Sequence, residues 1–331
     1  MMTDTPKVLA QQNFMPIEPR SKAIPHLWEW RDTRAEALHM GATVHNTERR
    51  VVRLANPALE PRVATTNTLF AGVQIVMPGE IARAHRHTQS ALRFVIESTG
   101  GYTNVNGDCI PMLPGDLVLT PNWNWHDHAN TTDLPMIWLD GLDTPLVGML
   151  EAEFYEEYPE NAQPVGEARD TGLTKFGGRG LVPRWEEHRT SHSPLLHYPW
   201  DDARATLQRL ASTAQASATD GVILEYVNPV TGGPVMPTIA CHVQMLRPGE
   251  HTAAHRHVSS TIYHVVEGSG TSVVNGKRLE WGEKDVFCVP MWASHEHLNT
   301  TKQPSLLFSF TDTPLFQRLD LYREEARPNE G

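Results

Sequence analysis

Short apolar runs separated by turn residues occur along the chain in two similar series. The runs are four to nine residues long, the length of β-strands, and Gly, Pro and Asn-Gly steps separate them. The first series covers 49–57, 69–77, 92–97, 102–105, 116–120 and 136–139, and the second covers 240–246, 261–267, 271–274, 285–289 and 306–310. This pattern predicts an all-β fold of sandwiches or barrels.

One stretch of the chain is repeated. Residues 78–87, PGEIARAHRH, recur as PGEHTAAHRH at 248–257, and residues 121–130, PNWNWHDHAN, recur as PMWASHEHLN at 290–299. The first pair is offset by 170 residues and the second by 169, so a single deletion explains the change. The hairpin signal Asn106-Gly107 recurs as well. This internal duplication predicts two β-barrels in one chain.

The composition suggests where the barrels begin and end. We expect the first barrel at 49–150 and the second at 236–320. An arm at 1–48 precedes them, and a tail at 321–331 follows. The arm is polar and interrupted by prolines over 1–25, and an ordered segment is expected to begin at His26. The connector, 151–235, is rich in Pro, Gly and charged residues. A few short helices are expected in the connector.

The connector contains one plausible helix, from Asp202 to Gln215. Leu207 and Leu210 would lie on one side of it, and either Asp201 or Asp202 would serve as its N-cap. We interpret this helix as structural.

The charge balance and the cysteines exclude several classes of protein. Lys+Arg 28 against Asp+Glu 39 gives a net charge of −11 with no basic block, so a nucleic-acid partner is not expected. Cys109, Cys241 and Cys288 are far apart, which favours a reducing compartment over a disulfide framework. The N-terminus has no signal-peptide core, and no apolar run reaches membrane length. We therefore expect a cytoplasmic protein without a membrane partner.

Three histidines in the repeated stretch are candidate metal ligands. His85 and His87 are separated by one residue, so on a strand both point to the same face. His126 follows after a hairpin and would come from a neighbouring strand. Imidazoles that converge from two strands are typical of a metal site. The second barrel keeps an equivalent set, His255, His257 and His295; the alternative there is a group of hydrogen-bonded core histidines.

These motifs resemble those of the cupin superfamily, whose jelly-roll barrels they would build. The matching positions are Gly79, His85, His87, Gly115, Pro121, His126 and Asn130. The chain departs from the general motif twice: no acidic residue occurs in T-Q-S-A-L at 88–92, and Trp123 replaces a glycine. With H-R-H-T-Q-S-A-L-R-F and W-H-D-H-x-N, these departures resemble the gentisate 1,2-dioxygenase branch, which includes salicylate, 5-nitrosalicylate and 1-hydroxy-2-naphthoate dioxygenases.

The resemblance implies a bicupin that binds Fe(II) on His85, His87 and His126 and opens an aromatic ring beside its carboxylate. The partners would be a small aromatic hydroxy acid and O2, with gentisate first and salicylates or 1-hydroxy-2-naphthoate as alternatives. It also implies a homo-oligomer, usually a tetramer, and leaves open a second metal in the C-terminal barrel. The residues implied for substrate binding or catalysis are Arg49, Phe70, Gly72, Gln74, Arg93, His128 and Asp140.

The chemistry of these residue types agrees with that role. By its spacing, Arg93 should share a strand face with His85 and His87 and point inward, where a buried arginine needs an anion. The alternative is a structural salt bridge, for example with Glu97. His128 would either hydrogen-bond a ring hydroxyl or oxygen, or only orient its neighbour. Asp140 is more easily understood as a supporting group than as a catalytic one.

Two rival functions come from other classes. An oxalate-type bicupin decarboxylase usually needs the glutamate ligand that is missing after His87. In a non-catalytic ligand-binding bicupin we would expect some of the triad histidines to be replaced by other residues, whereas both triads are intact. In the second barrel Tyr263 stands where the repeat has Arg93, so ring cleavage is not expected there.

Overall fold

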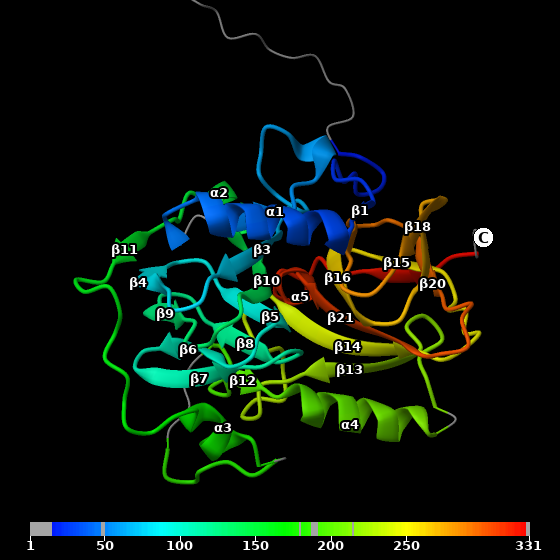
Figure 1. Cartoon of the computed structure of the whole chain (residues 1–331). Helices are drawn as coiled ribbons and strands as arrows, with labels where there is room; N and C mark the ends of the chain where they lie inside the picture. The colour runs from blue at the N-terminus through cyan, green and yellow to red at the C-terminus, as the bar shows by residue number, and fades with distance from the viewer. Residues whose placement is uncertain (1–14, 48–49, 179, 187–190, 214, 329–331) are drawn as a thin grey trace, which may run out of the picture.

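The computed structural model describes residues 15–328 apart from 48–49, 179, 187–190 and 214. Four antiparallel sheets form two units, which lie side by side (Figure 1). In the N-terminal unit the strand orders are β12-β8-β5-β10-β3-β2 and β11-β4-β9-β6-β7. In the C-terminal unit they are β1-β19-β16-β21-β14-β13 and β18-β17-β20-β15-β22. The prediction of a duplicated all-β chain is confirmed.

Each predicted run coincides at least in part with a strand, and the structure contains further strands that the runs did not include. The N-terminal unit contains β2 (Val51–Arg53), β3 (Phe70–Val76), β4 (Ile81–His87), β5 (Ala91–Glu97), β6 (Gly101–Val105), β7 (Asp108–Met112), β8 (Leu117–Thr120), β9 (His126–Ala129), β10 (Met136–Leu142), β11 (Tyr155–Glu157) and β12 (His197–Tyr198). The C-terminal unit contains β1 (His26–Trp28), β13 (Val222–Tyr226), β14 (Ala240–Leu246), β15 (His255–His257), β16 (Thr261–Glu267), β17 (Gly270–Val274), β18 (Lys277–Trp281), β19 (Val286–Val289), β20 (His295–Leu298), β21 (Ser305–Thr311) and β22 (Glu324–Ala326). The helices are α1 (Trp30–Thr43), α2 (Thr144–Met149), α3 (Thr171–Phe176), α4 (Trp200–Ala211) and α5 (Thr313–Arg318), with a 3₁₀ turn at Pro57–Leu59.

The hairpin signal is confirmed in both units. Asn106 and Gly107 join β6 to β7 with φ values of 52° and 89°. Asn275 and Gly276 join β17 to β18 with φ values of 48° and 75°. Two consecutive left-handed residues match the twist of the flanking strands, which is why Asn-Gly is favoured there.

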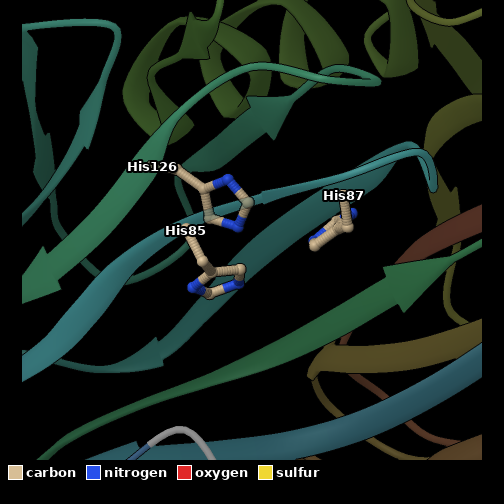
Figure 2. A group of neighbouring side chains, drawn as sticks. All are labelled: His85, His87 and His126. Carbon is tan, nitrogen blue, oxygen red and sulfur yellow. The ribbon is translucent and has the colours of Figure 1, made fainter. Parts of the chain in front are cut away.

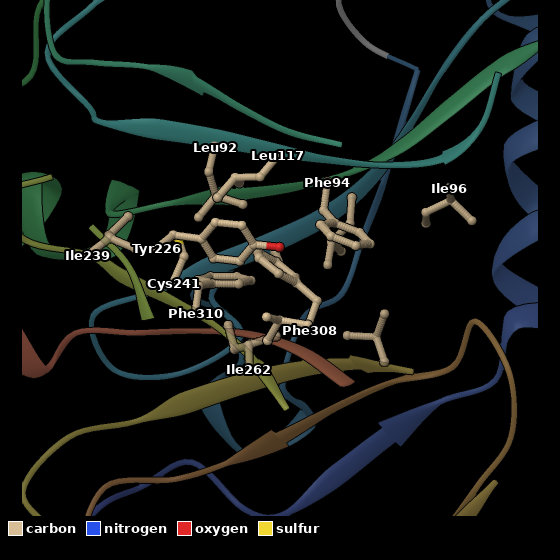
Figure 3. Close-up of a cluster of buried hydrophobic side chains, with 14 of the residues drawn as sticks. Leu92, Phe94, Ile96, Leu117, Tyr226, Ile239, Cys241, Ile262, Phe308 and Phe310 are labelled. Atoms are coloured by element: carbon tan, nitrogen blue, oxygen red, sulfur yellow. The ribbon is translucent and has the colours of Figure 1, made fainter. Parts of the chain in front are cut away.

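The largest apolar cluster lies between the two units. On β5, Leu92 and Phe94 point toward β21 of the C-terminal unit, where Phe308 and Phe310 meet them (Figure 3). The rings of Phe94 and Phe308 stack with centroids 4.2 Å apart. Because successive strand residues alternate between faces, the residue between Leu92 and Phe94, which is Arg93, faces the interior of its own unit. The interface between the units thus holds in place a strand that carries a predicted site residue.

The two longer helices are related by the duplication. Each packs on one unit, whereas the strand that precedes it pairs with a strand of the other unit. β1 precedes α1 and pairs with β19, whereas β12 precedes α4 and pairs with β8. The backbone N–H of Trp30 donates to the Asp285 carboxylate over 2.7 Å, and that of Trp200 donates to Asp116 over 3.0 Å. Each helix therefore begins against a carboxylate of the unit on which its leading strand lies, which suits the positive end of a helix.

This arrangement corrects two expectations. The longest helix, α1, lies in the second half of the N-terminal arm, where an ordered segment from His26 was expected but no helix was predicted. The helix expected at 202–215 begins at Trp200, and its N-cap position is Pro199, so neither Asp201 nor Asp202 is the cap. Both aspartates lie in the first turn instead, and Asp116, just before β8, accepts from the backbone N–H of Trp200. Among the described residues no helix has the length and apolar character needed to span a bilayer.

A buried histidine beside this contact should make stability depend on pH. His197 Nδ1 lies 2.6 Å from the Asp170 carboxylate, and its Nε2 lies 3.1 Å from that of Asp116. Although burial opposes it, these two carboxylates raise the pKa of His197 to about 9. The imidazolium therefore stabilises the fold fully below the unfolded-state pKa of about 6.5 and loses this contribution as pH rises through about 9.

We expect the free energy of unfolding to fall by up to about 3 kcal/mol between pH 6.5 and 9.5 from this group alone. Urea denaturation at both pH values, for the wild type and His197→Gln, measures it. The variant should be less stable at pH 6.5 and should lack most of the decrease. His39→Gln, at an exposed position on α1, is the matched control. A full pH dependence in His197→Gln would contradict the assignment.

Candidate active site

The three predicted histidines of the N-terminal unit converge. β4 and β9 are neighbours in one sheet, and His85 lies directly opposite His126 in their register. The ring centroids are 4.3 Å apart for His85 and His126, 4.9 Å for His87 and His126, and 5.6 Å for His85 and His87. One nitrogen of each ring lies within 4.8 Å of those of the other two, and Figure 2 shows the rings pointing toward one another.

Each ring is held in the orientation that a metal ligand requires. The Nδ1 atoms lie 2.9 Å from the backbone carbonyls of Arg83, Gln89 and Asn124, for His85, His87 and His126 in turn. A carbonyl can only accept, so each Nδ1 carries the proton and each Nε2 keeps its lone pair. His126 Nε2 is buried and has no hydrogen-bond partner among the described residues. A buried acceptor without a partner indicates a missing ligand, and a cation fits it.

Burial also keeps these rings uncharged. It lowers the pKa of His85, lowers that of His87 to about 3, and lowers that of His126 well below its ordinary value. All three imidazoles are therefore neutral near pH 7, which is the form that binds a metal.

A cavity of about 610 Å³ opens beside the triad, between the two sheets of the unit. It brings together seven of the predicted site residues: Phe70, Gln74, His85, His87, Arg93, His128 and Asp140. His126 is fully buried beneath it. Gly72 lies on β3 opposite Asp140; a Cβ there would come within 2.5 Å of Val51 Cγ1, so a larger residue would displace that side chain. Arg49 lies outside the described residues.

Four further residues line the cavity that the sequence did not indicate: Met40, Val51, Arg53 and Leu142. Leu142 is two residues from Asp140 on β10, so strand alternation would have found it. Val51 and Arg53 share one face of β2 for the same reason. Met40 comes from α1, and no sequence pattern connects that helix to the site.

Arg93 reaches the cavity from a different place than expected. It lies on β5 in the sheet that faces the histidines, not on their strand. Residues 88–90 break the strand run and turn the chain over to the facing sheet, so counting alternate residues across them was wrong. Arg93 is buried, its Nη1 donates to Thr120 Oγ1, and its Nε lies 3.6 Å from Asp140 Oδ1.

The carboxylate near Arg93 is Asp140, not Glu97. Glu97 instead pairs with Arg34 over 3.1 Å and with Lys284 over 3.2 Å, outside the cavity. Trp138 Nε1 donates to Asp140 Oδ1 over 2.8 Å and fixes the carboxylate. Burial raises the pKa of Asp140 to about 6, against the opposing effect of Arg93. Asp140 therefore supports Arg93, and a second anion can approach the guanidinium from the cavity.

His128 lines the cavity, and its Nδ1 is held from behind. Thr103 Oγ1 lies 2.8 Å from His128 Nδ1 and 2.9 Å from Met112 Sδ. Burial lowers the pKa of His128 well below its ordinary value, so the ring is neutral. A neutral imidazole has one N–H and one lone pair, so with Nδ1 bonded to Thr103 its Nε2 can make a hydrogen bond to a ligand in the cavity.

The two departures from the general motif have structural reasons. Trp123 keeps the left-handed backbone of the glycine it replaces, with φ of 60°, and the Arg86 guanidinium lies 4.5 Å from its ring centroid. Where an acidic ligand is missing, Gln89 uses its carbonyl to hold His87, and its side-chain amide donates to Glu153 over 3.0 Å. No fourth protein ligand from that segment reaches the triad.

Comparison with known proteins agrees with this geometry. The cupin domain family matches residues 72–141 and 242–311. A 5-aminosalicylate 1,2-dioxygenase from Comamonas sp is 41% identical over 325 residues, which cover 96% of this chain and 86% of that protein. The chain belongs to the family of gentisate and salicylate 1,2-dioxygenases.

Other members of the family are similar over the same length. A gentisate 1,2-dioxygenase from Aquipseudomonas alcaligenes is 37% identical, covering 93% of this chain and 88% of that protein. The crystal structure of a salicylate 1,2-dioxygenase from Pseudaminobacter salicylatoxidans superposes with a TM-score of 0.90 at 37% identity, covering 96% of this chain and 93% of that one. As a family member, this chain is a ring-cleaving dioxygenase.

Proposed function

We propose that this dioxygenase uses Fe(II), held by His85, His87 and His126, to open the ring of gentisate between its carboxyl-bearing and adjacent hydroxyl-bearing carbons. The observation that carries the proposal is the single cavity that joins a converged histidine triad to a buried arginine. Salicylate, 5-substituted salicylates and 1-hydroxy-2-naphthoate are alternatives, because they share the same adjacent carboxylate and hydroxyl.

The ligand set supports iron. Three neutral imidazoles from one side of a cavity leave coordination positions free, as non-haem Fe(II) oxygenases require. When bound, Fe(II) supplies positions for the two oxygens of the substrate and for dioxygen, and it conveys electron density from the ring. An oxalate-type decarboxylase would need a carboxylate ligand, and the segment 88–92, TQSAL, contains none.

The other cavity residues bind and orient the substrate. Arg93 can donate two parallel hydrogen bonds to its carboxylate. His128 accepts the proton, or a hydrogen bond, of a ring hydroxyl through Nε2. Phe70 and Leu142 provide apolar walls that exclude water from the ring. A role for Arg49 and a homotetrameric assembly stay predictions of the family resemblance.

Gentisate is the first candidate because its second hydroxyl makes the ring electron-rich. The relatives are named for substrates that differ at the positions away from the chelating pair: gentisate, 5-aminosalicylate and 1-hydroxy-2-naphthoate. In this chain Met40, Val51 and Arg53 lie on the side of the cavity formed by α1 and β2. The ring substituents that this side accommodates decide between gentisate and the alternatives.

Oxygen uptake by the anaerobically Fe(II)-loaded protein tests the proposal. Gentisate, salicylate, 5-aminosalicylate, 5-nitrosalicylate, 1-hydroxy-2-naphthoate and catechol are offered in turn. We expect uptake with gentisate, at the highest kcat/KM of the set, and none with catechol, which lacks the carboxylate for Arg93. Fastest uptake with another carboxylated phenol would replace gentisate as the substrate. No uptake with any of them, with iron bound, would reject the function.

A further inference from the structure

The C-terminal unit contains a second cavity, of about 450 Å³, at the duplicated position. Its triad has the same geometry as the first. The ring centroids are 4.2 Å apart for His255 and His295, 5.0 Å for His257 and His295, and 5.4 Å for His255 and His257. One nitrogen of each ring lies within 4.8 Å of those of the other two.

Two of these rings are anchored as in the first unit. His257 Nδ1 lies 3.2 Å from the Ser259 carbonyl and 2.7 Å from its hydroxyl, and His295 Nδ1 lies 3.0 Å from the Ala293 carbonyl. His295 is 1% exposed, and its Nε2 has no hydrogen-bond partner among the described residues. Such a nitrogen, aimed at two other imidazoles, indicates an absent cation, as at His126.

The surroundings of the second triad carry the opposite charge to those of the first. Tyr263 lies opposite Ser309 in the register where Arg93 lies opposite Asp140, so the buried arginine is absent. In the strand register, Glu324 lies opposite His257, at the place where Tyr155 lies opposite His87 in the first unit. The residues that line the second cavity include three carboxylates, those of Asp220, Glu225 and Glu324, and no lysine or arginine.

The duplicated edge strands show the same inversion. β2 pairs with β3 with Val52 opposite Val73, and β13 pairs with β14 with Leu224 opposite Val243. The next residue along each edge strand lines the cavity; it is Arg53 in the first unit and Glu225 in the second.

Hydrogen bonds hold two of the second cavity's carboxylates in place. Asp220 accepts from the Ser217 and Thr219 hydroxyls, each over 2.7 Å, and Tyr322 donates to Glu324 over 2.9 Å. Although burial acts the other way, the bonds from Thr219 and Ser217 lower the pKa of Asp220, so it is ionised near pH 7.

These differences decide which ligands each cavity can accept. Three neutral imidazoles leave the full charge of a divalent cation uncompensated, and a low-dielectric site requires compensation. In the first cavity a doubly anionic substrate provides it, and Arg93 attracts that substrate. In the second cavity fixed carboxylates provide it, and they repel an incoming carboxylate by like-charge interaction.

We infer that the C-terminal cavity binds a divalent metal ion whose charge is balanced by Asp220, Glu225 and Glu324, and that it excludes the carboxylated phenols. The remaining coordination positions take water or other uncharged or cationic ligands. This site is separate from the proposed ring-cleaving site and does not depend on it.

Two double variants separate the sites. His85→Ala/His87→Ala removes the N-terminal triad, and His255→Ala/His257→Ala removes the C-terminal one. Co²⁺ is titrated into each under anaerobic conditions, with visible absorption and metal per chain as readouts, before and after addition of salicylate. Circular dichroism confirms that each variant is folded. We expect two Co²⁺ per wild-type chain and one per chain of each double variant.

Salicylate should change the spectrum of the variant that keeps the N-terminal triad and should leave that of the variant that keeps the C-terminal triad unchanged. Absence of Co²⁺ from the latter, or a salicylate-induced change in its spectrum, would overturn the inference. If the proposed function were wrong, salicylate would leave the Co²⁺ spectrum of the variant that keeps the N-terminal triad unchanged, which is a different result.

A single substitution tests the charge balance without removing a ligand. In the His85→Ala/His87→Ala background, Glu324→Gln should weaken Co²⁺ binding about tenfold. Glu325→Gln is the matched control, because the neighbouring Glu325 pairs with Arg256 over 2.6 Å and does not line the cavity. Equal Co²⁺ affinity in the two variants would show that the carboxylates do not compensate the metal.

Discussion

Replacing Arg93 with alanine should lower kcat/KM for gentisate on the order of a thousandfold while leaving iron in the N-terminal triad. Truncating one partner of a buried, hydrogen-bonded charge pair costs roughly 2–5 kcal/mol, and about 4 kcal/mol corresponds to this factor. Two such losses combine here, because the substrate carboxylate loses its donor and Asp140 loses the guanidinium beside it. Arg93 is not one of the three histidines that converge as metal ligands, so the metal should remain.

Steady-state oxygen uptake and iron content per chain measure the two effects together. Arg93→Lys keeps the charge but not the planar pair of donors, so its activity should fall between those of the wild type and Arg93→Ala. Arg34→Ala removes an arginine that pairs outside the cavity, with Glu97, and should retain near wild-type kcat/KM. If Arg93 were only structural, Arg93→Ala would have a lower Tm and an unchanged kcat/KM per folded molecule.

The triad could be predicted from sequence because two simple regularities specify it. Alternation places His85 and His87 on one face of a strand, and the duplication repeats both residues at a constant offset. Their pairing with His126 follows from the hairpin between them, whose Asn-Gly turn is readable as well. These signals are local or repeated, so they can be recognised in the sequence without knowledge of the tertiary structure.

The helix α1 was missed although the same duplication contains it. Trp30, Asp32 and Arg34 recur as Trp200, Asp202 and Arg204, each at the offset of 170 that relates the first motifs. Arg34 pairs with Glu97, and Arg204 pairs with Glu267 over 3.0 Å, so the ion pairs repeat too. Extending the comparison upstream of residue 78 would have indicated both helices.

Other features depend on contacts between the units and leave no local signal. The carboxylates at the two helix starts, Asp116 and Asp285, lie just before β8 and β19, far away in sequence from the helices. Glu97 was considered as a partner for Arg93 because its position on the strand has the same parity, but Lys284 of the other unit and Arg34 of α1 hold it outside. Strand parity gives the face of a residue, not the partner that tertiary packing brings to it.

The second large effect is expected from the triad itself. His126→Ala should abolish gentisate-dependent oxygen uptake and weaken Fe(II) binding in the N-terminal unit by more than about a hundredfold, since even loss of a group that only supports a ligand costs 10–100-fold. His126 is fully buried, and its Nδ1 bonds the Asn124 carbonyl, so Nε2 is the nitrogen left for the metal. We expect no neighbouring side chain to replace that nitrogen as a ligand.

The duplication provides the matched control for this substitution. His295 occupies the equivalent place in the C-terminal unit, is equally buried, and bonds the Ala293 carbonyl in the same way. His295→Ala therefore removes the same ring from the same local structure and should leave ring cleavage largely intact. Equal loss of oxygen uptake in the two variants would mean that the units act together, whereas activity in His126→Ala would remove that triad from catalysis. The expected difference between two nearly identical substitutions follows from the charge of the neighbouring cavity, since arginine lines the N-terminal cavity and not the C-terminal one.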